Sequence, residues 1–388
     1  MKEQADQLFK QGILQYQEHQ FEAALQTWKE SLALYQNLND RKREAATWGN
    51  LGVGYEALGN LDQAIKSYQQ HLAIATQIQD LNGQALALGN LGNLYSTQGN
   101  YLQAIDTQQQ RLAIAHQLQD FQAEAQTLSN LGIAYHSAGD IPQAIKYYQQ
   151  QFIIAKKTDN QPSQGNALKN LRLAYQTLGE ETLAQDCYQQ QWTMLRQNFL
   201  DQKSDEFVKI AQIAGLDLRE DFVGADLRGF DLDYADLQGI NLENANLTQV
   251  NLALADLSAA NLAHADLTQA TLSNANLRDT NLSHANLTLA DLRTKLPRAN
   301  LSYANLTEAD LSGAYLPQAN LSHANLFSAN LKYADLSGVD FRNANLDEAN
   351  LSQAEFKDAI VENVSFAKAT GISRRVKSTL IERGAIFN

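Results

Sequence analysis

A spacing of five residues between large apolar side chains dominates the second half of the sequence. From Phe222 every fifth residue is large and apolar up to Leu292, and after one shorter step the series resumes at Leu301 and runs to Phe366. Of these 29 positions 24 are leucine, and 22 of the residues two places before them are alanine. A period of five fits neither the 3.6-residue turn of a helix nor the two-residue alternation of a long strand. The chain must therefore change direction within every five residues.

A short extended segment followed by a corner satisfies this period. In Ala225-Asp226-Leu227 the first and third side chains point to one side and the middle one to the other, as in a strand. The next two residues, Arg228-Gly229, have the composition of a turn. Repetition of this unit winds the chain into a coil with leucine and alanine inside and the other three residues outside.

This pattern resembles the pentapeptide repeat family. The resemblance implies a right-handed quadrilateral parallel β-helix over residues 222–366, in which four successive pentapeptides complete one coil. With coils at the usual strand separation of about 4.8 Å, about seven coils make a rod about 35 Å long.

Two short amphipathic segments flank the coil and are expected to cap its open edges. Ser204 to Ala214 begins with an N-capping serine, and Ser373 to Arg383 is terminated by Gly384. Their apolar stripes are Phe207, Ile210 and Ile213 in the first, and Val376, Leu380 and Ile381 in the second. After the second helix, Ala385-Ile386-Phe387 can plug the core. Capped ends argue against end-to-end stacking, so we expect a monomer.

A second repeat, with a period of 40, occupies the first half of the chain. The pair Asn-Leu begins at Asn50, Asn90, Asn130 and Asn170, and a glycine follows nine residues later in each unit. Apolar positions before and after that glycine have helical spacing, so each unit is predicted to be a helical hairpin. Five such units between about residues 2 and 197 would stack into a solenoid, because each hairpin leaves an apolar face that only the next can cover.

These units resemble the 40-residue form of the tetratricopeptide repeat, with Asn-Leu-Gly in the first helix and Leu-Ala-Ile-Ala in the second, as in Leu72 to Ala75 and Leu112 to Ala115. The predicted fold class is a multidomain protein of α and β structure, with an all-α superhelix followed by the β-helix and its capping helices. The expected domains are the helical repeats at 1–199, a linker and N-terminal cap at 200–221, the coil at 222–366, and the C-terminal cap and tail at 367–388.

The resemblance to tetratricopeptide repeats implies a peptide-binding groove. In that family the first helix of each hairpin lines the concave face, and the asparagine of Asn-Leu bonds the main chain of a bound peptide, which suits a side chain that offers both a donor and an acceptor. The alternative is that each asparagine bonds the backbone of its own repeat. A lysine-rich clamp for a C-terminal carboxylate is not visible, because of its candidate positions only Lys169 is basic. The candidate groove residues are Asn50, Val53, Asn90, Asn93, Asn130, Ile133, Lys169, Asn170 and Leu173.

Two features of the coil are candidates for function. The shorter step contains Arg293, Lys295 and Arg298, three of the eight basic residues between 222 and 366. It is either a tolerated one-residue deletion or an exposed bulge that contacts a partner.

On a four-sided coil, side chains at equivalent positions of successive coils also form a column in which neighbours lie about 4.8 Å apart. A pair of imidazoles without a third ligand is a poor metal site, so we expect a stacked ladder and no metal. The members of the column are Asn244, His264, His284, Tyr303, His323 and Asn343.

Charge and composition narrow the function. The net charge of −13 divides into −4 for residues 1–199 and −9 for residues 200–388, which disfavours direct nucleic-acid binding. The single cysteine, Cys187, cannot form an internal disulfide. No leader peptide, membrane span, cofactor motif or catalytic set is apparent, so we expect a cytoplasmic protein that is not an enzyme and needs no cofactor.

Two functional hypotheses follow. The first is a protein-binding adaptor or scaffold that holds a peptide segment in the helical groove and uses the β-helix as a rigid second surface. The alternative is an inhibitor that mimics DNA and acts on a type II topoisomerase or another DNA-binding protein, as some pentapeptide repeat proteins do. Residues 222–366 carry a net charge of −10, which is half of the roughly 20 phosphates on 35 Å of duplex. The combination of repeats resembles multi-repeat proteins of filamentous cyanobacteria.

Overall fold

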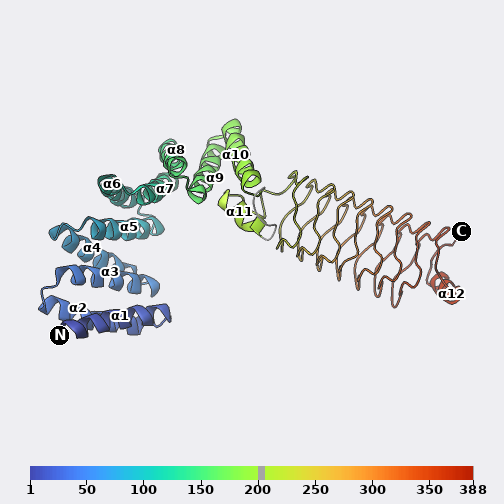
Figure 1. The fold of residues 1–388 in the computed structure, drawn as a ribbon, viewed down its shortest axis with the longest axis horizontal. Helices are drawn as coiled ribbons and strands as arrows, with labels where there is room; N and C mark the ends of the chain where they lie inside the picture. The colour runs from blue at the N-terminus through green and yellow to red at the C-terminus, as the bar shows by residue number, and fades with distance from the viewer. Residues whose placement is uncertain (200–205, 388) are drawn as a thin grey trace. The chain divides into compact units, whose positions relative to one another are not determined.

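The computed structural model describes residues 1–199 and 206–387. It contains two compact units, Met1–Gln191 and Trp192–Asn388, drawn in Figure 1. The helices are α1 (Lys2–Gln17), α2 (Phe21–Asn37), α3 (Arg41–Ala57), α4 (Leu61–Gln77), α5 (Leu81–Thr97), α6 (Tyr101–Leu118), α7 (Phe121–Ser137), α8 (Ile141–Lys157), α9 (Gln161–Leu178), α10 (Glu181–Phe199), α11 (Phe207–Ile213) and α12 (Arg374–Glu382). None of the helices in the described ranges has both the length and the apolar composition needed to cross a bilayer.

The helix boundaries follow from capping residues in the sequence. Asp40, Asp80 and Asp120 each accept a hydrogen bond from a main-chain N–H in the first turn of α3, α5 and α7. Gly59 and the equivalent glycines of the later repeats have φ between 72° and 86°, where glycine is favoured because it lacks a Cβ. The helical hairpin predicted for each unit therefore turns at this glycine.

Glycine brings the two helices of a hairpin into close contact. A Cβ added to Gly52 in α3 would lie 2.3 Å from Cε1 of Tyr68 in α4. A Cβ added to Gly132 in α7 would lie at the same distance from Cε1 of Tyr148 in α8. Both tyrosines are almost fully buried. An aromatic ring of the second helix thus fills the space that a side chain would occupy at each of these glycines.

Successive hairpins share one core. Tyr68 of the second hairpin, Ile105 of the third and Leu131 of the fourth belong to a single cluster of buried side chains. Figure 1 shows the helices following one another as a row of antiparallel pairs. The N-terminal unit is therefore a helical solenoid, as the 40-residue period predicted.

Three buried tyrosines make the helical unit sensitive to alkaline pH. Burial, with a hydrogen bond from its hydroxyl to Asp6, raises the pKa of Tyr35 to about 12. Burial also raises the pKa of Tyr68, which donates to Glu56, and that of Tyr148. In the unfolded chain a tyrosine loses its proton near pH 10. The stabilisation is therefore complete below pH 10 and is lost as the pH rises toward 12.

We expect the thermal midpoint of the helical unit, followed by circular dichroism at 222 nm, to fall steadily between about pH 10 and pH 12. Tyr148→Phe should reduce this slope, because it removes one group whose pKa burial raises. Tyr101→Phe is the control within the same unit, since this tyrosine at the start of α6 is only partly buried. An equal slope in wild type and Tyr148→Phe would contradict the assignment.

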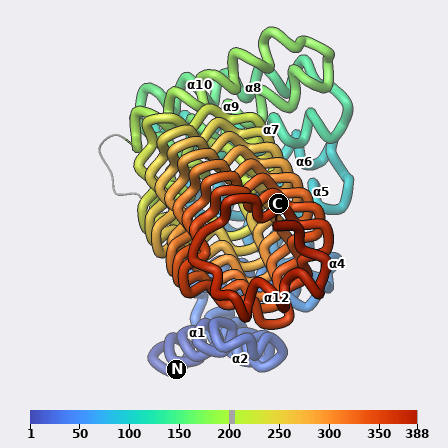
Figure 2. Tube along the Cα trace, turned by 90° about the vertical axis from the view of Figure 1, so that its right-hand side faces the viewer, coloured from blue at the N-terminus to red at the C-terminus, as the bar shows by residue number. Residues whose placement is uncertain are grey.

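The second unit is a coil whose pairing repeats after every four pentapeptides. Parallel bridges join equivalent positions of successive coils, for example Asn241 to Asn261 and Asn261 to Asn281, and Figure 2 shows the coils stacked behind one another. The pairing consists of isolated bridges, and no longer strand is present in the described residues. Leucines at the five-residue positions from Leu227 to Leu346 are at most 1% exposed. The predicted inward direction of these side chains is confirmed.

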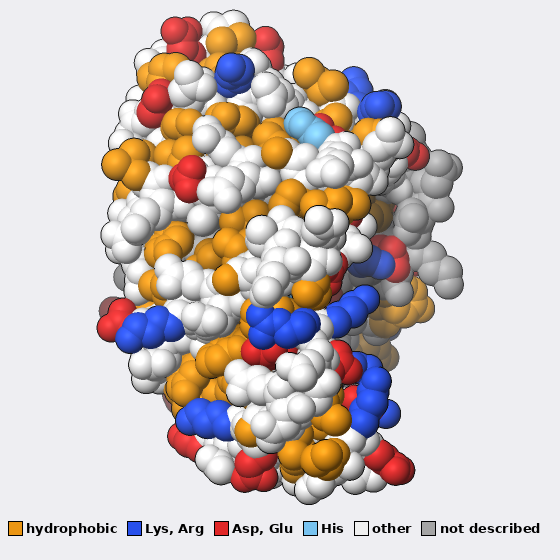
Figure 3. Space-filling model, turned by 90° about the vertical axis from the view of Figure 1, so that its left-hand side faces the viewer, with side chains coloured by type: hydrophobic (Ala, Val, Ile, Leu, Met, Phe, Trp, Pro, Cys, Tyr) orange, Lys and Arg blue, Asp and Glu red, His pale blue; other side chains and the backbone are white. Residues whose placement is uncertain are grey.

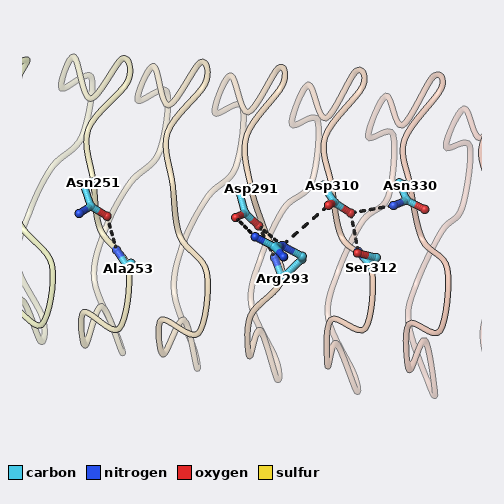
Figure 4. A network of polar contacts seen from close by, with 7 residues as sticks. All are labelled: Asn251, Ala253, Asp291, Arg293, Asp310, Ser312 and Asn330. Atoms are coloured by element: carbon cyan, nitrogen blue, oxygen red, sulfur yellow. Dashed lines mark hydrogen bonds and ion pairs between the residues drawn. The ribbon is translucent and has the colours of Figure 1, made fainter.

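The corners and the residue before each leucine hold the coil in shape. The second corner residue has a positive φ at nearly every turn, as at Gly229 (80°) and Leu254 (61°). The asparagine or aspartate before the leucine accepts a hydrogen bond from the N–H two residues on, as Asn251 does from Ala253 in Figure 4. An asparagine at this position also donates from its side chain to the equivalent residue of the preceding coil, as Asn330 does to Asp310. These residues point outward as predicted, but their polar groups are used within the coil.

The shorter step near Arg293 remains within the coil. Bridges there connect Asn276 to Lys295 and Asn281 to Asn300, a step that is one residue shorter than elsewhere, and the usual step resumes between Lys295 and Tyr315. Thr294 takes the place of the usual alanine and is only 5% exposed. Of the two alternatives, the one-residue deletion describes the backbone here, because one side is shortened while the pairing continues. A contact of these basic residues with a partner stays a prediction.

The N-terminal edge of the coil is covered by more than the predicted helix. Ser204 lies outside the described residues, and α11 begins at Phe207, which is fully buried. Phe207 contacts Phe222 and Phe230 of the first coils. Trp192 in α10 adds an edge contact to Phe222, with ring centroids 5.2 Å apart. The cap is thus an aromatic cluster assembled from separate segments.

The C-terminal edge is closed mainly by the last residues. Ile386 forms a parallel bridge with Ser365, and the ring of Phe387 stacks on Phe366 at 4.9 Å. Of the predicted plug, Ala385 is buried and Phe387 packs on the buried Phe366, but Ile386 is 41% exposed. The predicted apolar stripe of α12 is confirmed only at Leu380, because Ile381 is 50% exposed.

Candidate functional site

The four asparagines of the 40-residue period occupy the same position on successive first helices. Asn50, Asn90, Asn130 and Asn170 lie in α3, α5, α7 and α9, and all four are partly buried. Their hydrogen bonds within the described structure go to side chains: Asn130 donates to Asn93 at 2.9 Å, and Asn170 donates to Asn166 at 2.9 Å. None of these bonds goes to the main chain of its own repeat, which was the alternative to a role in ligand binding.

Two cavities bring most of the candidate groove residues together. Asn50, Val53 and Asn90 line a cavity of about 440 Å³ between α3, α4 and α5. Asn93, Asn130 and Ile133 line a second one of about 220 Å³. The remaining candidates, Lys169, Asn170 and Leu173, lie on α9 and line neither cavity. Leu173 is 54% exposed and Ile133 is 43% exposed, so both present apolar surface to solvent.

The larger cavity contains buried nitrogen atoms without partners. Nδ2 of Asn50 and Nδ1 of His71 have no hydrogen-bond partner within the described structure. His71 is 4% exposed, and burial lowers its pKa although the Asp80 carboxylate opposes this. The imidazole is therefore neutral at pH 7, and the cavity offers polar groups that a ligand can use.

The prediction from sequence missed a second polar row, on the second helix of each hairpin. Its members recur with the same 40-residue period and lie in a buried or partly buried phase: Ser31, His71, Arg111, Gln151 and Gln191. Only one of them, Arg111, carries a permanent charge. The 40-residue period could have revealed this row, because polar residues that recur at a position otherwise suited to apolar side chains indicate a common role.

The side chains around Arg111 leave its guanidinium without a counterion. A Cβ on Gly89 would lie 3.2 Å from the guanidinium carbon, so this glycine of α5 makes room for the side chain. Nε is buried without a hydrogen-bond partner. Within the described residues no carboxylate forms an ion pair with Arg111, and burial lowers its pKa against the opposing field of Asp120.

The predicted column on the coil is confirmed as a stack of rings. Centroid distances are 4.7 Å for His264 to His284, 4.8 Å for His284 to Tyr303, and 4.5 Å for Tyr303 to His323. Asn343 extends the column with a 3.4 Å contact from its Nδ2 to the ring of His323. No group of three or more His, Cys, Asp or Glu side chains in the described ranges is arranged to hold a metal ion.

The basic residues of the shorter step are largely paired. Arg293 bonds Asp291 at 2.6 Å and lies 3.8 Å from Asp310, as Figure 4 shows. Arg298 bonds Asp279. Lys295 is exposed. These side chains therefore lie on the wall of the coil, and two of the three are held by neighbouring carboxylates.

The lone cysteine has the environment of a packing residue. Cys187 in α10 is 5% exposed, and burial raises the pKa of its thiol to about 11. A thiol that stays protonated at neutral pH is a weak nucleophile. Cys187 therefore contributes to packing within the helical unit.

The visible surface carries charges of both signs. Figure 3 shows acidic and basic side chains interspersed with apolar and uncharged polar ones over one face of the molecule. Neither sign dominates this face, and interspersed opposite charges largely cancel at a distance.

Two family models match the chain. The model for pentapeptide repeats matches residues 221–258, 255–293, 294–332, 304–343 and 334–370. The model for the tetratricopeptide repeat matches residues 6–77, 43–117 and 123–194. No protein with a curated description matches the chain.

Several solved structures resemble one part of the chain or the other. HetL of the cyanobacterium Nostoc sp. strain PCC 7120, a pentapeptide repeat protein involved in regulating heterocyst differentiation, is 37% identical over 39% of this chain and 71% of its own, with a TM-score of 0.30. A putative kinesin light chain of Podosopora anserina with TPR-like repeats is 19% identical over 49% of this chain and 93% of its own, with a TM-score of 0.43. A Rap protein complexed with competence and sporulation factor is 17% identical over 53% of this chain and 54% of its own, with a TM-score of 0.39.

Proposed function

Because this chain belongs to the tetratricopeptide repeat family in its N-terminal part and to the pentapeptide repeat family in its C-terminal part, we propose that it is a non-enzymatic adaptor. Its helical unit binds an extended segment of a partner protein, and its coil serves as a rigid second surface. Repeats of both kinds are typical of protein-interaction modules.

The observation that carries the proposal is the row of asparagines beside buried polar groups that lack hydrogen-bond partners. Asn50 and Asn90 line one cavity together, and Asn130 lines the next. Nδ2 of Asn50 is a buried donor without an acceptor in the described structure. A peptide main chain offers a carbonyl and an N–H at regular spacing, so it can satisfy such a row where a compact ligand would reach only one member.

In this proposal the coil at 222–366 is a right-handed quadrilateral parallel β-helix. Bridges that join every fourth pentapeptide, with a corner in each pentapeptide, support four sides in each turn. Residues 1–199 are the binding domain, 200–221 the linker and first cap, and 367–388 the second cap. Covered edges at both ends favour a monomer.

The alternative, an inhibitor that mimics DNA, has weaker support. Asp226, Asp279, Asp291 and Asp340 each form a hydrogen-bonded ion pair with an arginine, which lowers the pKa of these carboxyls and offsets their charge. Pairing with Ile386 also occupies the last coil, where end-to-end dimers would form. The unpaired charge on the coil is therefore sparser than the row of phosphates it would have to imitate.

We expect the double variant Asn90→Ala/Asn130→Ala to lose peptide binding. The full chain is first used to select binders from a random peptide library, and fluorescence anisotropy then measures their affinity. Because each alanine removes a side-chain amide from the row that the proposed peptide follows, affinity should fall by at least about tenfold.

The matched control is Asn37→Ala, an exposed asparagine at the end of α2. It should bind the selected peptides as wild type does. Selection of no peptide by the wild-type chain, or equal binding by the double variant, would contradict the proposal.

A further inference from the structure

Arg111 is a partly buried cation for which the folded chain supplies no anion. Its Nε is buried without a partner, and no ion pair is formed within the described structure. The carboxylate whose charge acts on the pKa of Arg111 is Asp120, but this carboxylate caps α7 by accepting the N–H of Ala123 at 2.9 Å. A guanidinium removed from water without a counterion is unfavourable, so its retention needs an explanation.

The position of Arg111 relates it to the candidate groove. It is the counterpart, in the next hairpin, of His71, which lines the larger cavity together with Asn50 and Asn90. His71 packs beneath Gly49, and Arg111 packs beneath Gly89 in the same way. Gly89 directly precedes Asn90, so Arg111 lies next to the row of asparagines that the proposed peptide would follow.

The other members of the row show that charge is not required for packing here. The equivalent residues are Ser31, His71, Gln151 and Gln191, and Gln151 is 2% exposed while donating to Ser163. A neutral side chain therefore fits this position in the same fold. Arginine occurs only in the third repeat, and it presents a planar group that matches a carboxylate.

We propose that Arg111 is the specificity-determining residue of the groove and pairs with the side-chain carboxylate of an aspartate or glutamate in the bound segment. This inference rests on the proposed peptide-binding function and names the chemistry of the partner. The bound carboxylate supplies the anion that the fold omits, and the charged pair is formed only in the complex.

The test compares the peptides selected by three forms of the full chain: wild type, Arg111→Gln and Lys146→Gln. Glutamine is the residue that the fourth repeat carries at this position, so Arg111→Gln should fold normally. Lys146→Gln removes the same charge from an exposed site on α8. The library is displayed so that its peptides have no free C-terminal carboxylate, which leaves only side-chain acids.

Wild type and Lys146→Gln should select peptides with an aspartate or glutamate enriched at one position, and Arg111→Gln should select peptides without this enrichment. In a synthetic selected peptide with an amidated C terminus, replacing that glutamate by glutamine should weaken binding to wild type by at least about tenfold and binding to Arg111→Gln by less than about twofold. As a control for folding, the thermal midpoint of Arg111→Gln should be equal to or higher than that of the wild type.

The outcomes separate the two proposals. If wild type selects peptides without an acidic preference, or if Arg111→Gln keeps that preference, the role of Arg111 is overturned while peptide binding stands. If wild type selects no peptide at all, the groove function fails and this inference fails with it.

Discussion

Leu287→Ala should lower the free energy of unfolding of the coil by about 3 kcal/mol. Leu287 is fully buried between neighbouring coils. Its truncation removes apolar contacts and leaves a cavity that the regular coil above and below cannot close, because every bridge there is fixed by its neighbours. Hydrogen exchange of amides in residues 222–366, measured by mass spectrometry, reports this loss even while the helical unit stays folded.

The chain offers a matched control two residues away. Leu289 occupies a corner with φ of 59° and is 46% exposed. Leu289→Ala should change the free energy of unfolding by less than about 0.5 kcal/mol, since a surface truncation leaves no cavity. Equal losses in the two variants would mean that leucines spaced by five do not form the core.

Gly132→Ala should destabilise the helical unit by about 2 kcal/mol. The added methyl group would lie 2.3, 2.5 and 2.9 Å from three atoms of the Tyr148 ring. Tyr148 is 2% exposed, so the ring has no free space to enter, and α7 and α8 must move apart. The thermal midpoint followed at 222 nm measures the effect.

Gly92→Ala separates this steric effect from a general effect of glycine substitution. Its added methyl group would lie 2.4 Å from the amide nitrogen of Gln108. Gln108 is 1% exposed, but it lines the cavity of about 220 Å³ together with Gly92, so its flexible amide end has space to rotate into. The variant also gains up to about 1 kcal/mol of helix propensity, so its net change should stay below about 1 kcal/mol. A larger loss for Gly92→Ala than for Gly132→Ala would contradict the role assigned to the tyrosine ring.

The two periods predicted the direction of most side chains correctly. Leu227 and its successors are buried, and the ring column from His264 to His323 is stacked. These predictions succeeded because the repeats share one local geometry, so the side-chain direction inferred for one copy applies to every copy.

The predictions that depended on a single copy were less accurate. The N-terminal cap draws on Trp192, Phe207 and Phe230, which no sequence period connects. The segment around Arg293 was expected to protrude as one alternative, but Thr294 replaces an alanine inside and the bridges continue past it. Non-repeating contacts of this kind are set by the shapes of the surfaces that meet.

The sequence by itself determined the repeating architecture, since periods of 40 and of five dictate which side chains share an interior. Only the tertiary structure decided which polar side chains are left without a partner there. Arg111 and Gln151 occupy equivalent positions, but the guanidinium of Arg111 has no counterion in the described structure, whereas the amide nitrogen of Gln151 donates to Ser163 and its Oε1 lacks a partner. The position of a residue in the repeat gives the direction in which its side chain leaves its own helix. The hydrogen-bond or ion-pair partner of that side chain comes from the next hairpin, so the distance between them depends on how the two surfaces pack.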